Sequence, residues 1–225
     1  VAVCVAVASG RKIGLMQRST MQEAIAAPQV GGIVKMTEFI LKTTVLIEGL
    51  GAVCLFPVFR KEFGLGKGIW YALFHSVSAF CNAGFDLMGE KEAFSSLTSY
   101  VDNPVVNLTI MLLIVIGGIG FMTWEDVKSN RWHIQKYRMQ SKVVFTVTGI
   151  LLGFPFLYFY FREFSHMTGM QRFWMAAFQT VTPRTAGFNT ADLASMSEQG
   201  QLTTILLMLN GGSPGSTAGG MKTTT

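Results

Sequence analysis

Two stretches of this sequence repeat one motif: residues 70–88 read WYALFHSVSAFCNAGFDLM, and residues 174–192 read WMAAFQTVTPRTAGFNTAD. Both follow the pattern Trp-x3-Phe-x2-Val-[Ser/Thr] and then, after a short gap, Ala-Gly-Phe-[Asp/Asn]. Each copy lies between long apolar segments, and an internal repeat is the first guide to an architecture. A short helix followed by a glycine-centred turn between two membrane spans is how a cation-selective pore loop is built. The repeat therefore predicts two pore loops.

The composition indicates a membrane protein. Half of the 225 residues are hydrophobic, only 14% are charged, and the mean hydropathy is +0.40. A soluble domain usually carries about 25% charged residues. The three cysteines are scattered and show no metal-ligand or disulfide spacing. No nucleophile–base constellation stands out, so we expect no enzyme and no bound cofactor. The sequence predicts an all-α polytopic membrane protein built from repeated helix, pore-loop, helix units.

Three parts follow along the chain, which we expect to be an internal piece of a longer protein. Residues 1–35 are expected to hold the end of an inner helix, over residues 1–8, and a cytosolic loop. Residues 36–128 are expected to form one repeat, and residues 129–225 a second repeat whose last helix is interrupted. Within these repeats we expect spans at 36–59, 105–124 and 143–161, a charged loop at 60–69, short pore helices at 70–81 and 174–183, and a helix start at 201–209. Asn103-Pro104 is a natural helix start for the span at 105–124, which has a Gly-Gly-x-Gly flexure near its end.

The orientation follows from the distribution of basic residues. The loops at 10–35 and 125–142 hold four and five of the 18 Lys and Arg residues. Positively charged loops stay in the cytoplasm, so both are predicted to be cytoplasmic and the pore mouths external. The external side then carries most of the acids, which would raise the local concentration of cations.

A cation can cross a membrane only if other groups replace its water shell, and rings of backbone carbonyls do this in potassium channels. Aiming successive carbonyls at one axis needs backbone conformations that glycine alone reaches freely. Gly84 and Gly187 are the candidates for these positions. The neighbouring carbonyls would come from Asn82, Ala83, Thr185 and Ala186. The alternative is that each Ala-Gly-Phe forms an ordinary tight turn.

The segment LNGGSPGSTAGGMKTTT, residues 209–225, allows two specific hypotheses beside a plain surface loop. A nucleotide-binding P-loop has the pattern G-x4-G-K-[ST], but after Gly215 and Gly220 the lysine comes one residue late. The second hypothesis is a helix break inside the membrane that lines a cavity and plugs it below the filter. The residues of this predicted gate are Gly211, Gly212, Gly215, Ser216, Thr217, Gly219, Gly220 and Lys222.

Two charged residues fall within apolar surroundings. Glu48 lies in a predicted span, where an acid serves either function or pairing with another helix. Arg184 follows Pro183 in the second pore loop, and we expect it to brace the filter through hydrogen bonds.

Four stretches together resemble the Ktr/Trk/HKT superfamily of potassium transporters, and most of all the ion-translocating KtrB-type subunit of bacterial Ktr systems. The resemblance implies four repeats with pseudo-fourfold symmetry around one pore. It also implies sodium-dependent potassium uptake across the bacterial cell membrane, by symport. The chain would contribute the second and third filter strands and the gating loop at 210–222. The stretches that carry the resemblance are SAFCNAGFDL, GGIGFMTWEDV, QTVTPRTAGFNT and GGSPGSTAGGMKTTT.

The resemblance further implies partners: a second copy of the protein in a homodimer, and a cytosolic nucleotide-binding regulatory ring of the KtrA type. The basic loops at 10–35 and 125–142 would be docking surfaces, and nucleic acid is not an expected partner. Two other functions compete with transport. One is a nucleotide-dependent membrane ATPase that uses residues 215–222, and the other is a membrane scaffold that transports nothing.

Overall fold

The computed structural model describes residue 22, residues 33–90 and residues 93–224. The expected helix end at 1–8, and all of the loop at 10–35 apart from residues 22 and 33–35, lie outside this set. The chain divides into two units, Val1–Val45 and Leu46–Thr225, and every site discussed below belongs to the second. Every regular element of the described residues is a helix, beside one isolated bridge between Asn210 and Met221. The prediction of an all-α fold is confirmed.

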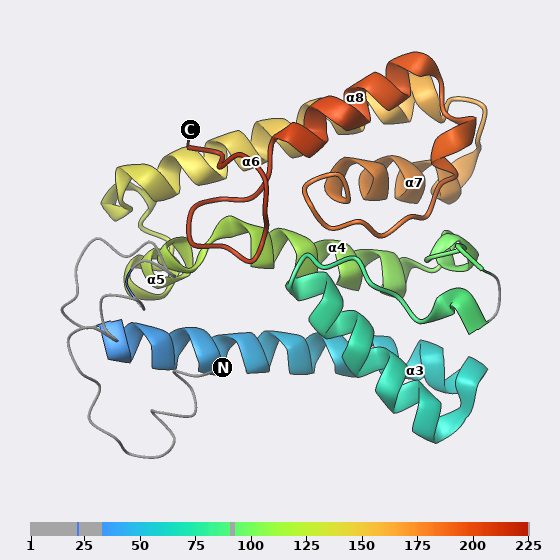
Figure 1. The fold of residues 1–225 in the computed structure, drawn as a ribbon. Coiled ribbons are helices and arrows are strands. Elements are labelled where there is room, and N and C mark those ends of the chain that lie inside the picture. Colours follow the sequence, from blue (N-terminus) through green and yellow to red (C-terminus); the bar gives the residue numbers. More distant parts are fainter. Residues whose placement is uncertain (1–21, 23–32, 91–92, 225) are drawn as a thin grey trace. The chain divides into compact units, whose positions relative to one another are not determined.

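Helix α3, Ile33–Phe80, contains the first predicted span and the first pore helix. Its backbone leaves helical geometry at Gly64, where φ is 78° and ψ is −177°, so α3 is two helical arms joined by a sharp turn (Figure 1). The expected ten-residue loop at 60–69 is therefore wrong. A Cβ at Gly68 would lie 2.8 Å from the Cα of Arg60, so glycine lets the chain double back without a loop.

The next span is broken. Asn103 caps helix α4, Pro104–Ile119, by accepting hydrogen bonds from the N–H groups of Val105 and Val106, and proline occupies the first turn. The helix stops at Gly120, where φ is 98°, and helix α5, Phe121–Asn130, leaves at 94° to it. The predicted flexure in Gly-Gly-x-Gly is confirmed, and the span expected at 105–124 ends as a helix at Ile119.

Three further helices form the repeat at 129–225: α6, Met139–Tyr158, α7, Gly169–Val181, and α8, Glu198–Leu209. After Pro155 the helix α6 widens into a π-helical turn, Phe159–Glu163. Helix α7 begins five residues before the predicted pore helix, and α8 three residues before the predicted start. Short 3-10 helices lie at Met88–Glu90, Thr98–Tyr100, Ile134–Lys136 and Leu193–Ser195.

Helix α7 packs against α4, α6 and α8, and a cluster of buried apolar side chains joins α7 to α8 and to the π-helical turn that follows α6. The end of α6 is tied to the start of α8, because the Glu163 carboxylate accepts hydrogen bonds from the N–H and hydroxyl of Ser197. Gly200 makes this approach possible, since a Cβ there would meet the carboxylate of Glu163. The cluster of buried apolar side chains around α7 consists of Phe159, Phe164, Met175, Ala176, Ala191, Met196 and Leu207.

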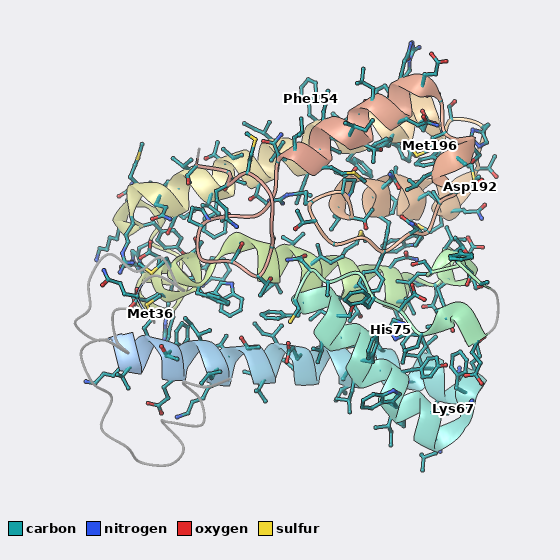
Figure 2. The ribbon with its side chains drawn as sticks, in the orientation of Figure 1. Met36, Lys67, His75, Phe154, Asp192 and Met196 are labelled. Atoms are coloured by element: carbon teal, nitrogen blue, oxygen red, sulfur yellow. The ribbon has the colours of Figure 1, made fainter. Side chains whose placement is uncertain are left out.

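Large apolar side chains also lie on the outside of the long helices. Phe154 on α6 is 78% exposed (Figure 2), and Leu50 on α3 and Ile150 on α6 are exposed as well. Val34–Phe80 and Met139–Glu163 are long and apolar enough to cross a membrane, and the bent pair α4 and α5 adds a third candidate. An apolar exterior on such helices is what contact with lipid chains requires. The described residues thus have the surface of a membrane protein.

Polar contacts join the pore-loop side of α3 to the loops that follow it. The carboxylate of Glu90 accepts hydrogen bonds from the Lys67 ammonium (labelled in Figure 2) and from the hydroxyl of Tyr71. The lysine bond, together with the tyrosine bond, holds the pKa of Glu90 below its ordinary value. The Tyr100 hydroxyl donates to Glu62, while burial, followed by the nearby Tyr71, raises the pKa of Tyr100 to about 12.

Candidate functional site: two filter strands and a re-entrant loop

The two Ala-Gly-Phe segments adopt the same unusual backbone. Gly84 and Gly187 have φ angles of 71° and 88°, in the left-handed region that favours glycine. Two residues earlier, Asn82 and Thr185 also have positive φ, at 50° and 65°. A left-handed conformation is uncommon for any residue with a Cβ and costliest for a β-branched one such as threonine. Paired strain at equivalent positions of two repeats indicates a shared function rather than two unrelated turns.

A hydroxyl at the end of each pore helix fastens the strand that follows. Ser78 Oγ donates to the carbonyl of Phe85 at 2.7 Å, and Thr182 Oγ1 donates to the carbonyl of Phe188. The backbone carbonyls of Ser78 and Thr182 accept the N–H groups of Ala83, at 2.9 Å, and of Ala186, at 3.0 Å. Each strand is thus held at both ends against its own pore helix.

The repeat at 129–225 fastens its strand in the same way with one residue fewer. Its alanine N–H reaches four residues back along the chain, where the first repeat reaches five. The tighter turn at Pro183 and Arg184 absorbs the difference, and it explains why the two motifs are one residue out of register in the sequence.

The two strands meet at their glycines. A Cβ on Gly84 would overlap the carbonyl oxygen of Ala186 and lie 2.9 Å from the Cα of Gly187. Residues of both strands, Ala83 on one side and Thr185, Ala186 and Gly187 on the other, line a cavity of about 310 Å³. The cavity continues toward α7 and α8, where the Gln179 amide donates to the Thr204 hydroxyl at 3.2 Å. Four of the six predicted filter residues therefore line one open space, and Gly84 contacts the opposite strand beside it.

His75 supports the first strand from the pore helix (Figure 2). Its Nδ1 lies 2.7 Å from the carbonyl of Tyr71, while its Nε2 accepts the N–H of Leu87 at 3.3 Å. A carbonyl only accepts, so Nδ1 carries the proton and the imidazole is neutral. The ring is fully buried and also faces the ring of Phe188 in the second strand, with 6.4 Å between centroids. Histidine here positions the backbone beyond the filter.

The predicted gate is a closed loop that starts where α8 ends. Gly211 and Gly212 donate their N–H groups to the carbonyls of Met221 and Gly219, so the loop returns to its own base. A Cβ on Gly211 would meet the carbonyl of Gly219, which explains why the base must contain glycine. The Lys222 ammonium donates to the carbonyl of Ala218 at 2.8 Å.

This loop docks into the bend between α4 and α5. The carbonyl of Gly118 accepts the N–H of Ser213 at 2.9 Å, and the carbonyl of Gly215 accepts the N–H of Phe121 at 2.8 Å. The bend at Gly120 exposes the backbone groups that an unbroken helix would use internally, and the loop satisfies them. In Figure 1 the segment after α8 descends to the junction of α4 and α5. Two motifs some hundred residues apart are thus one structural unit.

The same loop also reaches the filter strands. Thr217 Oγ1 donates to the carbonyl of Phe80 at 2.8 Å and accepts from the side-chain amide of Asn82 at 3.0 Å. The N–H of Gly219 donates to Thr185 Oγ1 at 3.2 Å. All the predicted filter and gate positions therefore lie in one contiguous region of the second unit.

A P-loop does not fit this geometry. P-loops connect a strand to a helix and leave their backbone N–H groups free for phosphate. Here the segment follows helix α8, and the N–H groups of Ser213, Thr217 and Gly219 are used by α4 and by the filter. Lys222 is turned toward the carbonyl of its own loop.

Arg184 and Glu48, the two charged residues singled out in the sequence, each contact a hydroxyl on a neighbouring helical segment. Arg184 is buried, and its Nη2 lies 3.5 Å from the Thr148 hydroxyl of α6, so the guanidinium joins the second pore loop to the preceding helix. Glu48 lies on α3 against the first pore helix, where its backbone carbonyl accepts the hydroxyl of Ser76 at 2.6 Å. The Cys81 thiol lies 3.9 Å from the carboxylate of Glu48.

Sequence reasoning missed the structural residues of the site. Ser78 and Thr182 stood in the repeated pattern, and their identical offset from the preceding Trp and Phe of the motif was the signal that could have found them. Gly117 and Gly118 were read only as a flexure, although they form the seat of the loop. Nothing in the local sequence indicates the contact between His75 and Leu87.

Comparison with known proteins extends this geometry. The sequence profile of the TrkH family, described as cation transport protein, matches residues 1–225. The chain belongs to this family. It is 41% identical over 220 residues to the potassium/sodium uptake protein NtpJ of Enterococcus hirae, with 96% of the chain and 48% of that protein covered. It is 37% identical over 230 residues to the Ktr system potassium uptake protein B of Bacillus subtilis, covering the whole chain and 50% of that protein.

The fold agrees with a solved structure. The crystal structure of the potassium transporter TrkH from Vibrio parahaemolyticus matches with a TM-score of 0.70 over 92% of the chain and 44% of that protein, at 21% identity. The chain spans about half the length of the curated relatives it matches. The predictions of the family and of the all-helical membrane fold are confirmed at this level.

Proposed function

We propose that this chain forms two consecutive repeats of a potassium uptake pore, with residues 36–128 as the second repeat and residues 129–225 as the third. The observation that carries the proposal is the pair of matched strands, each with positive φ at two equivalent positions and each fastened by a pore-helix hydroxyl. Such strands present backbone carbonyls that replace the hydration shell of K⁺. Two further strands, from the rest of the parent protein, would complete the ring.

Ion ligands in this proposal are the carbonyls of Asn82, Ala83, Gly84, Thr185, Ala186 and Gly187. The short helices α7 and the second arm of α3 end just before the strands, and the carbonyl ends of their dipoles favour a cation. K⁺ is the transported ion, and Na⁺ is the coupling ion of a symport. The printed name of the Enterococcus relative, a potassium/sodium uptake protein, supports both ions.

The loop at 210–222 is the gate of this pore. It lies against the filter strands and the α4–α5 bend, and its glycines allow it to move without strain at each residue. In the full-length parent protein, deletion of residues 213–218 should raise K⁺ flux into liposomes while K⁺ stays preferred over Na⁺. Adding Gly84→Ser to the deletion should abolish that preference. A folded deletion protein with unchanged or lower flux would contradict the gate.

The deletion also separates the gate from a nucleotide-binding loop. A membrane ATPase that used residues 215–222 would lose nucleotide binding and activity together when the loop is cut. A scaffold would show no flux above that of empty liposomes in either form.

The parent protein would act in the bacterial cell membrane as a homodimer on a cytosolic, nucleotide-binding ring of the KtrA type. The printed name of the Bacillus relative, component B of a Ktr system, supports such a partner. The basic segment 125–142, which spans the end of α5, a short 3-10 helix and the start of α6 instead of the single loop expected, offers a docking surface, because Trp132 and Ile134 are 94% and 64% exposed among its Lys and Arg residues. Trp132→Ala with Ile134→Ala should reduce co-purification of the ring, whereas Phe94→Ala should not.

A further inference from the structure

The loop contacts the filter at two points, and these points are equivalent in the two repeats. Asn82 and Thr185 are the non-glycine residues with positive φ that precede each Ala-Gly-Phe. The side chain of each is hydrogen-bonded to the loop, by Thr217 in one case and by Gly219 in the other. The two loop residues are separated by a single residue, so one short segment braces both strained positions.

The contact at Asn82 is the more closely built of the two. Asn82 is only 9% exposed, and its amide donates to Thr217 Oγ1 at 3.0 Å. The same hydroxyl donates to the carbonyl of Phe80, the last residue of the pore helix, at 2.8 Å. The backbone N–H of Thr217 donates to the carbonyl of Gly117 at 3.2 Å. A single hydroxyl therefore acts as donor and acceptor at once, which a threonine can do and a valine cannot.

Gly117 makes room for this arrangement. A Cβ there would overlap the carbonyl of Phe80 and lie 2.8 Å from Thr217 Oγ1. The pore helix, the filter strand, α4 and the loop thus meet at one point, within hydrogen-bonding distance of one another.

We propose that Thr217 and Asn82 form a latch through which the gating loop sets the geometry of the filter. Asn82 is held in its left-handed conformation by a partner on a movable element, so displacement of the loop releases the first filter strand as well as unblocking the pore. Ion selectivity then depends on the position of the gate, and Asn82 is a positioning residue for selectivity through its side chain. This inference rests on the proposed function.

The test is the ratio of K⁺ to Na⁺ flux through the full-length parent protein in liposomes. Thr217→Val removes the hydroxyl and keeps the shape of the side chain. The change removes two hydrogen bonds, but only the one from Asn82 holds the filter strand, so the ratio should fall by the worth of one net hydrogen bond, roughly two- to tenfold. Thr217→Ser should restore a ratio close to that of the unmodified protein. Combining Asn82→Leu with Thr217→Val should lower the ratio no further than the stronger single change.

Thr223→Val is the matched control. Thr223 directly follows the loop, and its hydroxyl donates to Ser213 Oγ in the loop at 3.2 Å without contacting the filter strands, so its loss is expected to change the flux without changing the flux ratio. A merely structural role for Thr217 would change flux or protein yield and leave the ratio unaltered. If Asn82→Leu does not fold, the valine and serine variants of Thr217 still decide the question.

Two failures are distinguishable. If the unmodified parent protein passes K⁺ and Na⁺ equally, the proposed function is wrong. If that protein selects K⁺ and Thr217→Val selects it equally well, or if Thr223→Val lowers the ratio as much, the latch alone is wrong.

Discussion

The two filter glycines should differ in their tolerance of a side chain, although the motif makes them equivalent. Placing any L-residue at Gly84 or Gly187 forces a left-handed conformation that costs roughly 1–2 kcal/mol, a factor of about 5–30. At Gly84 a Cβ would in addition lie 2.9 Å from the Cα of Gly187, whereas at Gly187 it would lie 3.5 Å from the Cα of Gly84. Because carbon atoms pack best at about 3.5–4.0 Å, only Gly84→Ser forces the strands apart, by roughly 0.6 Å or more.

We therefore expect both variants to lower K⁺ affinity, and Gly84→Ser to lose discrimination against Na⁺ more severely. The assay is K⁺ uptake, with and without competing Na⁺, by cells that express the full-length parent protein and lack other uptake systems. Gly89→Ser is the control, since Gly89 has open space around it and lies beyond the filter strand. Equal effects at the two filter glycines, or a larger effect at Gly187, would refute the close approach of the strands.

Three further predictions test the surroundings of the site. Gly117→Ala should disturb the gate, because its Cβ overlaps the Phe80 carbonyl, and K⁺ flux at rest should rise; a wild-type resting flux would count against the seat of the loop. In a background without native cysteines, Ser99→Cys should react with an impermeant thiol reagent added outside intact cells, and Ser129→Cys should not. Both positions are exposed, so the difference would come from the side of the membrane, with Ser129 in the basic segment predicted to be cytoplasmic. The reverse labelling would invert the topology. The Lys67 and Tyr71 partners depress the folded-state pKa of Glu90, so the contribution of Glu90 to stability is fully present above the ordinary pKa of 4.5 and is lost as the pH falls through the lower folded pKa. The difference in melting temperature between wild type and Glu90→Gln should therefore disappear in acid. A difference that stays constant with pH would reject the interaction.

The sequence was sufficient to predict features that depend on local chemistry. Asn103-Pro104 begins a helix because a capping side chain and a proline act within one turn. Gly84 and Gly187 were identified because the need for positive φ is a property of single residues. The second copy of the motif argued against a coincidental Ala-Gly-Phe sequence.

Features that depend on distant contacts were not predictable. The chain turns at Gly64, but the sequence offers three glycines at positions 64, 66 and 68, and only the packing of the two arms selects one. The seat of the loop joins Gly118 to Ser213, and no periodicity within either segment indicates that partner. The hydroxyls of Ser78 and Thr182 acquire their function only when the strand folds back over the pore helix.

The central claim is that the two Ala-Gly-Phe strands belong to a potassium-selective filter. Its most direct test is K⁺ uptake by the full-length parent protein in cells that lack their own uptake systems, grown in low potassium. The account predicts that the parent protein restores growth and K⁺ uptake, and that the double variant Gly84→Ser with Gly187→Ser, present in the membrane at the same level, does not. Failure of the parent protein to restore uptake, or full uptake by the double variant, would contradict it.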